Sequence, residues 1–151
     1  MKLKALFEKR LLRKIPVDMN KSKKSLEISK KYLSDSKKLI STGSFNFVIL
    51  SAYTSMFHAA RALLYKDGIQ EKSHFAVFAY IKEKYSKEIG QQLLFEFNNA
   101  REQRHEGIYG LEYEFNQEDV KHIISVAEKF HKKIRELLLR NTKNIKNLNN
   151  K

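Results

Sequence analysis

The chain has 151 residues, 42% of them hydrophobic, which is enough for one globular domain with a substantial core. It contains no cysteine, so disulfides, thiolate chemistry and zinc sites of the usual Cys/His type are excluded. Thirty Lys and Arg against 17 Asp and Glu give a net charge of +13, which favours an acidic partner: nucleic acid, an anionic membrane surface or an acidic protein. A general bias of the composition toward Lys and Asn would give the same excess, so charge alone does not choose among these partners.

Residues 1–15, MKLKALFEKRLLRKI, form the first expected unit, an amphipathic helix with Lys and Arg between its apolar positions. Such a helix lies on a membrane or packs on its own domain. The segment lacks the uninterrupted apolar core and the cleavage site of a signal peptide. No later apolar run approaches the roughly 20 residues that cross a bilayer. We therefore expect a cytoplasmic protein with no membrane partner.

Residues 16–140 are expected to form a helical bundle, and residues 141–151 a basic, polar and frayed tail. Pro16 separates the bundle from the first helix. Apolar periodicity predicts further helices over about 19–42, 45–66, 74–85, 91–106 and from 117 onward. Asp18, Ser44, Ser73 and Asn116 are the expected caps, and Gly43, Gly68 and Gly107 the expected stops. The 19–42 helix should bury its leucines and leave a solvated side rich in Lys and Ser. The fold class is all-α, an up-and-down bundle of five to six helices.

The bundle is organised around residues 52–65, AYTSMFHAARALLY, which are apolar on most of their surface. His58 and Arg61 interrupt that surface and share one face, three positions apart. One interpretation is a polar pair satisfied within the core, held by Glu96 or a backbone carbonyl. The other is that both residues hold a neighbouring functional site in place.

A second polar group lies at the end of the 91–106 helix. Asn98, Arg101 and His105 share a face at spacings of three and four, Arg104 lies one step round, and Tyr109 follows. Arginine binds phosphate oxygens and stabilises developing negative charge, and histidine transfers protons near neutral pH. With the 2′-hydroxyl of RNA, these are the parts that metal-independent cleavage requires. The same pattern also fits a solvated helix face on which arginine pairs with Glu102 or Glu106.

The remaining histidines are given no catalytic role. His74 falls at a helix start, where a neutral imidazole contacts backbone or an anion, and His122 and His131 are expected at the surface or its boundary. No spacing of His, Asp and Glu resembles a metal site, and there is no glycine-rich phosphate loop or nucleophile elbow. We therefore expect neither metal nor cofactor.

Three segments in this order, AYTSMFHAARALLYKDG, KSHFAVFAYI and AREQRHEGIYG, resemble the HEPN domain, in particular its small stand-alone prokaryotic branch, over about residues 20–135. The resemblance implies a helical bundle that forms a homodimer. It also implies a metal-independent endoribonuclease in which an arginine, followed at a short spacing by a histidine, meets its counterpart across the dimer. Many such proteins belong to toxin–antitoxin pairs with a small nucleotidyltransferase, which in some pairs adenylylates a tyrosine just after the motif.

Carried onto this chain, the resemblance makes Arg104, His105 and Tyr109 the catalytic residues. Asn98 and Arg101 bind RNA or a nucleotide, and His58 and Arg61 support them. The chain departs from the ribonuclease motif, because three residues separate Arg101 from His105, and Tyr109 stands where the histidine after Arg104 is expected. The alternative is a non-catalytic module that binds a nucleotide or the nucleotidyltransferase partner, with Tyr109 as the residue that is modified.

Overall fold

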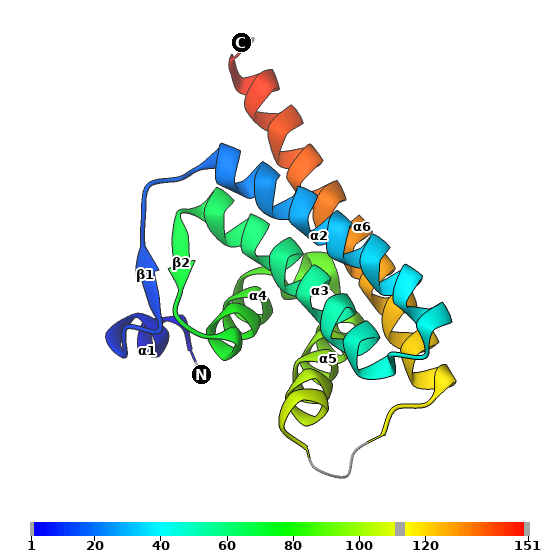
Figure 1. Ribbon diagram of the computed structural model, residues 1–151. Coiled ribbons are helices and arrows are strands. Elements are labelled where there is room, and N and C mark those ends of the chain that lie inside the picture. The colour runs from blue at the N-terminus through cyan, green and yellow to red at the C-terminus, as the bar shows by residue number, and fades with distance from the viewer. Residues whose placement is uncertain (1, 111–113, 150–151) are drawn as a thin grey trace.

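The computed structural model of the chain describes residues 2–110 and 114–149. Its elements are α1 (Leu3–Glu8), β1 (Leu12–Lys14), α2 (Met19–Leu39), a 3-10 turn (Ile40–Thr42), α3 (Phe45–Asp67), β2 (Ile69–Glu71), α4 (His74–Ile89), α5 (Gln91–Tyr109) and α6 (Gln117–Asn149). Helices α2, α3 and α6 run side by side, and α4 and α5 lie on the other side of α3 (Figure 1). The expected all-α bundle is confirmed, with a small two-stranded sheet added to it.

The helix ends follow the cap chemistry of the sequence at three of the four expected starts. Asp18 Oδ1 accepts from Lys21 N at 2.9 Å, and Ser73 Oγ accepts from Ala76 N at 3.1 Å. Asn116 and Asp119 bond reciprocally at 2.9 Å as a capping box. Ser44 makes no side-chain cap bond.

Gly107 lies inside α5, which continues to Tyr109, so the prediction that this glycine ends the helix is wrong. A Cβ on Gly107 would meet the ring of Phe115 at 3.1 Å. The glycine therefore serves the approach of the buried Phe115 to α5 and not the end of the helix.

Within residues 1–15, helix is limited to α1. Arg10 has a φ of +57° and turns the chain into β1, which pairs antiparallel with β2 so that Leu12 faces Glu71. Leu6 and Leu12 are buried in the common core, and α1 contacts α4. The structure therefore agrees with the second interpretation of this segment, that it packs on its own domain.

The contact of α2 with α3 is made by small side chains, which we call the serine seam: Ser22, Ser25, Ser29 and Ser36 are buried on α2, opposite Ala52, Ser55, Ala59 and Ala62 of α3. Ser22 Oγ donates to Ala62 O, Ser25 Oγ to His58 O and Ser55 Oγ to Ser29 O, each at 2.7 Å. The prediction that these serines share the solvated side of α2 is therefore wrong. Short side chains let the helices approach closely. A backbone carbonyl of the facing helix accepts from the hydroxyls of Ser22, Ser25 and Ser55, whereas Ser36 donates to Leu33 O of its own helix at 2.7 Å.

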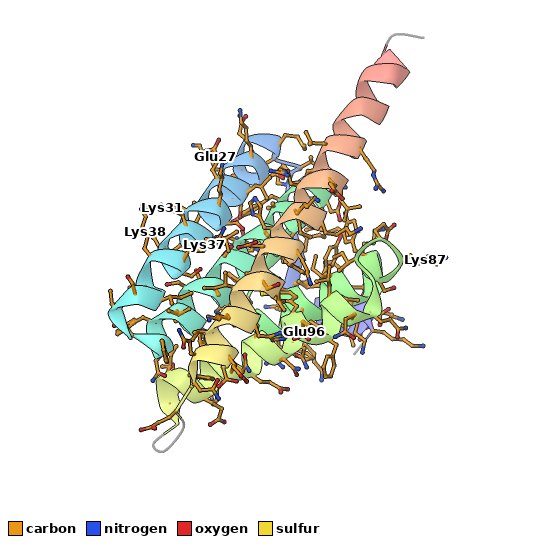
Figure 2. All side chains as sticks on the ribbon, turned by 90° about the vertical axis from the view of Figure 1, so that its right-hand side faces the viewer. Glu27, Lys31, Lys37, Lys38, Lys87 and Glu96 are labelled. Carbon is orange, nitrogen blue, oxygen red and sulfur yellow. The ribbon has the colours of Figure 1, made fainter. Side chains whose placement is uncertain are left out.

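The lysines of α2 do face outward, and Lys31, Lys37 and Lys38 line its free side in Figure 2. Lys37 Nζ reaches Glu128 of α6 at 2.9 Å. Helix α3, at 23 residues, is long and apolar enough by length and composition to cross a membrane. The sequence predicts no such segment when uninterrupted apolar runs alone are considered, because polar residues interrupt this helix. Most of its apolar 18-residue stretch is buried inside the bundle, as in the core helix of a globular domain.

Candidate functional site

His74, the first residue of α4, is held against the middle of α3. Its Nδ1 lies 2.8 Å from the hydroxyl oxygen of Tyr53. The ring of Phe57 stacks on the imidazole, with centroids 4.3 Å apart and planes 28° from parallel. The cap bond of Ser73 fixes the start of α4 one residue earlier. Two side chains of α3 and a helix cap thus set the position of this imidazole.

Arg101 and Arg104 of α5 reach toward the same place from a third element. The Cζ of Arg104 lies 5.9 Å from the ring centroid of Tyr53, and the Cζ of Arg101 lies 5.8 Å from that of Phe75. Asn98 Oδ1 accepts from Arg101 Nε at 3.2 Å and from Nη2 at 3.0 Å. The Phe75 ring and the Asn98 amide thus orient the guanidinium of Arg101, and the Tyr53 ring orients that of Arg104.

Neither arginine has a carboxylate within ion-pair distance in the part of the chain that the structure describes. Glu102 contacts the Asn98 amide at 3.5 Å, and Glu106 is exposed. The interpretation in which arginine pairs with Glu102 or Glu106 therefore finds no support among these residues. The cluster keeps an uncompensated positive charge, which favours an anionic ligand.

Burial and the arginines set the protonation states of the two partners on α3 and α4. Burial lowers the pKa of His74, and Arg104, Arg101 and Arg61 lower it further. Burial raises the pKa of Tyr53 far above its usual range, and the opposing effect of Arg104 and Arg101 is smaller. Both side chains are therefore neutral near pH 7, and the arginines carry the charge of the cluster.

Arg61 pairs with Glu71 of β2, where Nε lies 2.8 Å from Oε1, and its Nη2 donates to the hydroxyl of Tyr65 at 2.6 Å. Glu96, which is labelled in Figure 2, was proposed from the sequence as its partner. It instead contacts His122 Nε2 at 3.0 Å, between α5 and α6. The Cζ of Arg61 lies 5.5 Å from the centroid of Phe57, the ring that stacks on His74.

His58 stacks on Tyr32, with ring centroids 5.7 Å apart and planes 3° from parallel. Burial, then Arg61 and His74, lower its pKa to about 4. Arg61 lowers the pKa of His74, and His74 in turn lowers the pKa of His58, so Arg61 and His58 border the cluster at its α3 side.

His105 and Tyr109 lie at the exposed end of α5. Their ring centroids are 5.0 Å apart, and Tyr109 is 65% exposed. Their rings contact each other, whereas Arg104 contacts the ring of Tyr53. The structure thus divides the predicted site into an inner part, with Asn98, Arg101 and Arg104, and an outer part, with His105 and Tyr109.

Sequence reasoning missed Tyr53, Phe57, Phe75 and His74, which complete the inner part. The histidine at a helix start was the available signal, but nothing in the sequence links it to Tyr53, 21 positions earlier. His131, expected at the surface or its boundary, is 7% exposed and bonds Ser29 Oγ through Nδ1 at 2.8 Å. Among the residues described, no group of three His, Cys, Asp or Glu side chains could hold a metal ion.

Comparison with known proteins agrees with this arrangement of helices. The model of the HEPN domain family matches residues 22–137, which include α3, α4, α5 and the inner part of the site. A UPF0332 protein of Thermotoga maritima is 29% identical over 126 residues, which cover 80% of this chain and 96% of that protein.

Proposed function

The chain belongs to the HEPN domain family, and from this premise we propose that it is the RNA-directed member of a toxin–antitoxin type system, in which Arg101 and Arg104 bind a phosphodiester group. One observation carries the proposal: two oriented guanidinium groups lie side by side on α5 without a carboxylate partner among the described residues. A phosphodiester supplies the missing negative charge and matches the donor geometry of arginine.

We extend the proposal to metal-independent cleavage. The 2′-oxygen of RNA attacks the neighbouring phosphorus, the bond from phosphorus to the 5′-oxygen breaks, and a 2′,3′-cyclic phosphate and a 5′-hydroxyl result. Arg104 stabilises the charge that grows on the non-bridging oxygens. His105, the next residue of the helix, takes or gives the proton, and Tyr109, whose ring contacts it, is the alternative.

The proposal includes a homodimer. Phe47, at the start of α3, is 62% exposed, and Ile108 at the end of α5 is 43% exposed. Asn46 Nδ2 lies 3.5 Å from Gly107 O, which places these two helix ends side by side. Exposed apolar side chains so grouped are typical of a contact surface. A second copy at this surface would bring its own α5 end toward the first, and Phe47→Asp should then give a monomer in light scattering.

The experiment for RNA is incubation of the pure protein with mixed-sequence RNA in EDTA. Loss of Arg104 should slow cleavage about 100-fold, because one stabilising donor of the transition state is removed. Arg101→Ala should weaken binding about tenfold. Arg135→Ala, which removes an exposed arginine of α6, is the charge-matched control. Equal cleavage by wild type, Arg104→Ala and His105→Ala would show that the assigned site is wrong.

Tyr109 supports a second candidate function, that of acceptor for a nucleotidyltransferase partner. Its exposed phenol could attack the α-phosphorus of ATP on such a partner, forming the tyrosyl–AMP bond and releasing pyrophosphate. Mass spectrometry after co-expression with a small nucleotidyltransferase would detect one AMP on the wild type and none on Tyr109→Phe. An unmodified Tyr109 after such co-expression counts against this function.

A further inference from the structure

The imidazole of His74 has no role in the function proposed above, although it lies in the middle of the inner cluster. We propose that His74, oriented by Tyr53, is a third phosphate ligand beside Arg101 and Arg104, and that the anion binds with uptake of a proton at this histidine. The inference rests on the proposed function, because it takes the ligand to be a phosphodiester. It adds a third side chain that contacts the phosphate, and a pH dependence of binding, to what the two arginines of α5 provide.

The first step is the tautomer of His74. The phenol of Tyr53 keeps its single proton, because burial raises its pKa. Its recorded hydrogen bond is with His74 Nδ1, at 2.8 Å. When the hydroxyl donates this bond, Nδ1 accepts it and the proton of the neutral imidazole lies on Nε2. His74 then offers an Nε2–H donor to a ligand, in a plane fixed by the stacked Phe57.

The second step is the charge around that donor. Tyr53 contacts both His74 and Arg104, one through its hydroxyl and the other through its ring, so an anion held by Arg104 lies beside the imidazole. On α3 and β2, Arg61 is paired with Glu71, and His58 is a second neutral imidazole. On α5, Arg101 and Arg104 have no carboxylate partner among the residues that the structure describes. Before the anion binds, a neutral imidazole offers its hydrogen bond without adding a fourth positive charge, and the anion must be present before that charge becomes favourable.

The third step is the coupling of anion and proton. Without a ligand, burial and the arginines hold the pKa of His74 below its usual value. A bound phosphodiester adds one negative charge at the same place and therefore raises that pKa. The proton taken up from solvent goes to Nδ1, which then donates to the oxygen of Tyr53 while the phenol proton turns away. Affinity for the anion should increase as pH falls through the interval between the pKa of His74 with the anion bound and its pKa without the anion.

The direct test follows the ring of His74 by NMR as pH is lowered, with and without a deoxydinucleotide that has a single phosphodiester and no terminal phosphate. The probe is built of two thymidines, so it has no 2′-hydroxyl to be cleaved and no base that takes up a proton in acid, and its charge is constant across the titration. We expect the midpoint of His74 to move to higher pH with the probe, and the free form to show the Nε2–H tautomer. A midpoint unchanged at saturation, or an Nδ1–H tautomer, overturns the inference.

Three variants make the test specific. His74→Gln places an amide N–H near the position of Nε2 but takes up no proton, so binding above about pH 7 should stay within about threefold of wild type, and the gain in acid should vanish. His74→Ala should bind about tenfold more weakly above about pH 7, and this deficit should grow as pH falls. His122→Gln on α6 is the control, and it should bind as wild type does.

These outcomes separate the inference from the function on which it rests. If His105→Gln abolishes the pH dependence and His74→Gln preserves it, the inference is wrong and the phosphate site on α5 stands. If Arg101→Ala and Arg104→Ala both bind the probe as wild type does, the proposed function fails as well. Should His74→Ala fail to fold, the NMR titration of the wild type still decides.

Discussion

Arg61 of α3 and Glu71 of β2 form an ion pair, 2.8 Å from Nε to Oε1, in which the carboxylate side chain is only 8% exposed. It ties the central helix to the strand that leads directly into α4 and His74. The pair therefore joins the core to the candidate site and helps to set the position of His74.

We predict that Glu71→Gln lowers the free energy of unfolding by about 2 kcal/mol, because it leaves the Arg61 guanidinium partly buried without its counter-charge. Arg61→Met removes the cation and strands the carboxylate, and should cost a similar amount. Urea unfolding of both variants and of the double variant measures the coupling. The double variant should cost less than the sum of the two, and additive losses would mean that the two charges do not interact.

Asp67 joins the end of α3 to α4, since its Oδ2 accepts from the hydroxyls of Tyr80 at 2.7 Å and Tyr85 at 2.6 Å. Asp67→Ala leaves both hydroxyls without this acceptor, and we predict a loss of about 3 kcal/mol in urea unfolding. Tyr80→Phe removes one bond and should cost about 1 kcal/mol. Glu27→Ala, a carboxylate on the exposed side of α2, should change stability little. A loss for Asp67→Ala no larger than that of Glu27→Ala would contradict this account.

His58 predicts a pH dependence of stability. Its pKa is about 4 in the folded protein, against 6.5 in the unfolded chain, so the unfolded state binds more protons as pH falls from about 6.5 to about 4. Stability is therefore fully present above that interval and is lost within it. The loss should be about 1–2 kcal/mol, below the ceiling set by the shift because the imidazole is only partly buried.

The check on His58 is urea unfolding from about pH 7 to about pH 4.5. His58→Phe keeps a ring against Tyr32 but does not titrate, so its loss of stability in acid should be smaller than that of wild type. Some loss remains in the variant, because burial also lowers the pKa of His74 and of His131. An identical acid loss in the variant and the wild type would remove His58 from this explanation.

Ser29 lies at the centre of the serine seam, where it bonds His131 Nδ1 at 2.8 Å and lies 3.2 Å from Ser55 Oγ. Ser29→Ala should cost about 1–2 kcal/mol, because it leaves polar atoms unpaired. Ser29→Leu should cost about 3 kcal/mol or more, because the added carbons have no room between the helices. The matched control is Ser34→Leu, on the exposed side of the same helix. Thermal unfolding that orders these variants differently would show that the seam is looser than its contacts indicate.

The sequence was sufficient for the helices whose ends carry local chemistry, as at Asp18, Ser73 and Asn116, because cap residues act on neighbouring backbone groups. It was insufficient where structure depends on residues far apart in the chain. The two strands are three residues each and exist through the pairing of Leu12 with Glu71, so no local alternation could reveal them. The buried serines of α2 were assigned to solvent because a hydroxyl suits either side, and the partners of Ser22, Ser25 and Ser29 lie on α3 and α6, far away in the sequence.

For the candidate site too, part could be predicted from local spacing and part depends on contacts between distant residues. Spacing along one helix was enough to group Asn98 with Arg101 and Arg104. Their lack of acidic partners among the described residues, and the approach of Tyr53 and His74 from two other helices, depend on packing that spacing does not contain. The roles predicted for His105 and Tyr109 stay predictions.

The serine seam also fixes which way this protein can move. A slide of α3 by one turn, about 5.4 Å, would break at once the hydroxyl–carbonyl bonds that Ser22, Ser25 and Ser55 make between α2 and α3. These bonds hold α2 and α3 in a single register, and Tyr53 and Arg61, which lie on α3, are held in place with it. Helices α4 and α5 share no such lock, and α4 already departs from helical geometry at Tyr85. A change of conformation on binding the proposed RNA ligand is therefore expected in α4 and α5, while α2 and α3 keep their relative position.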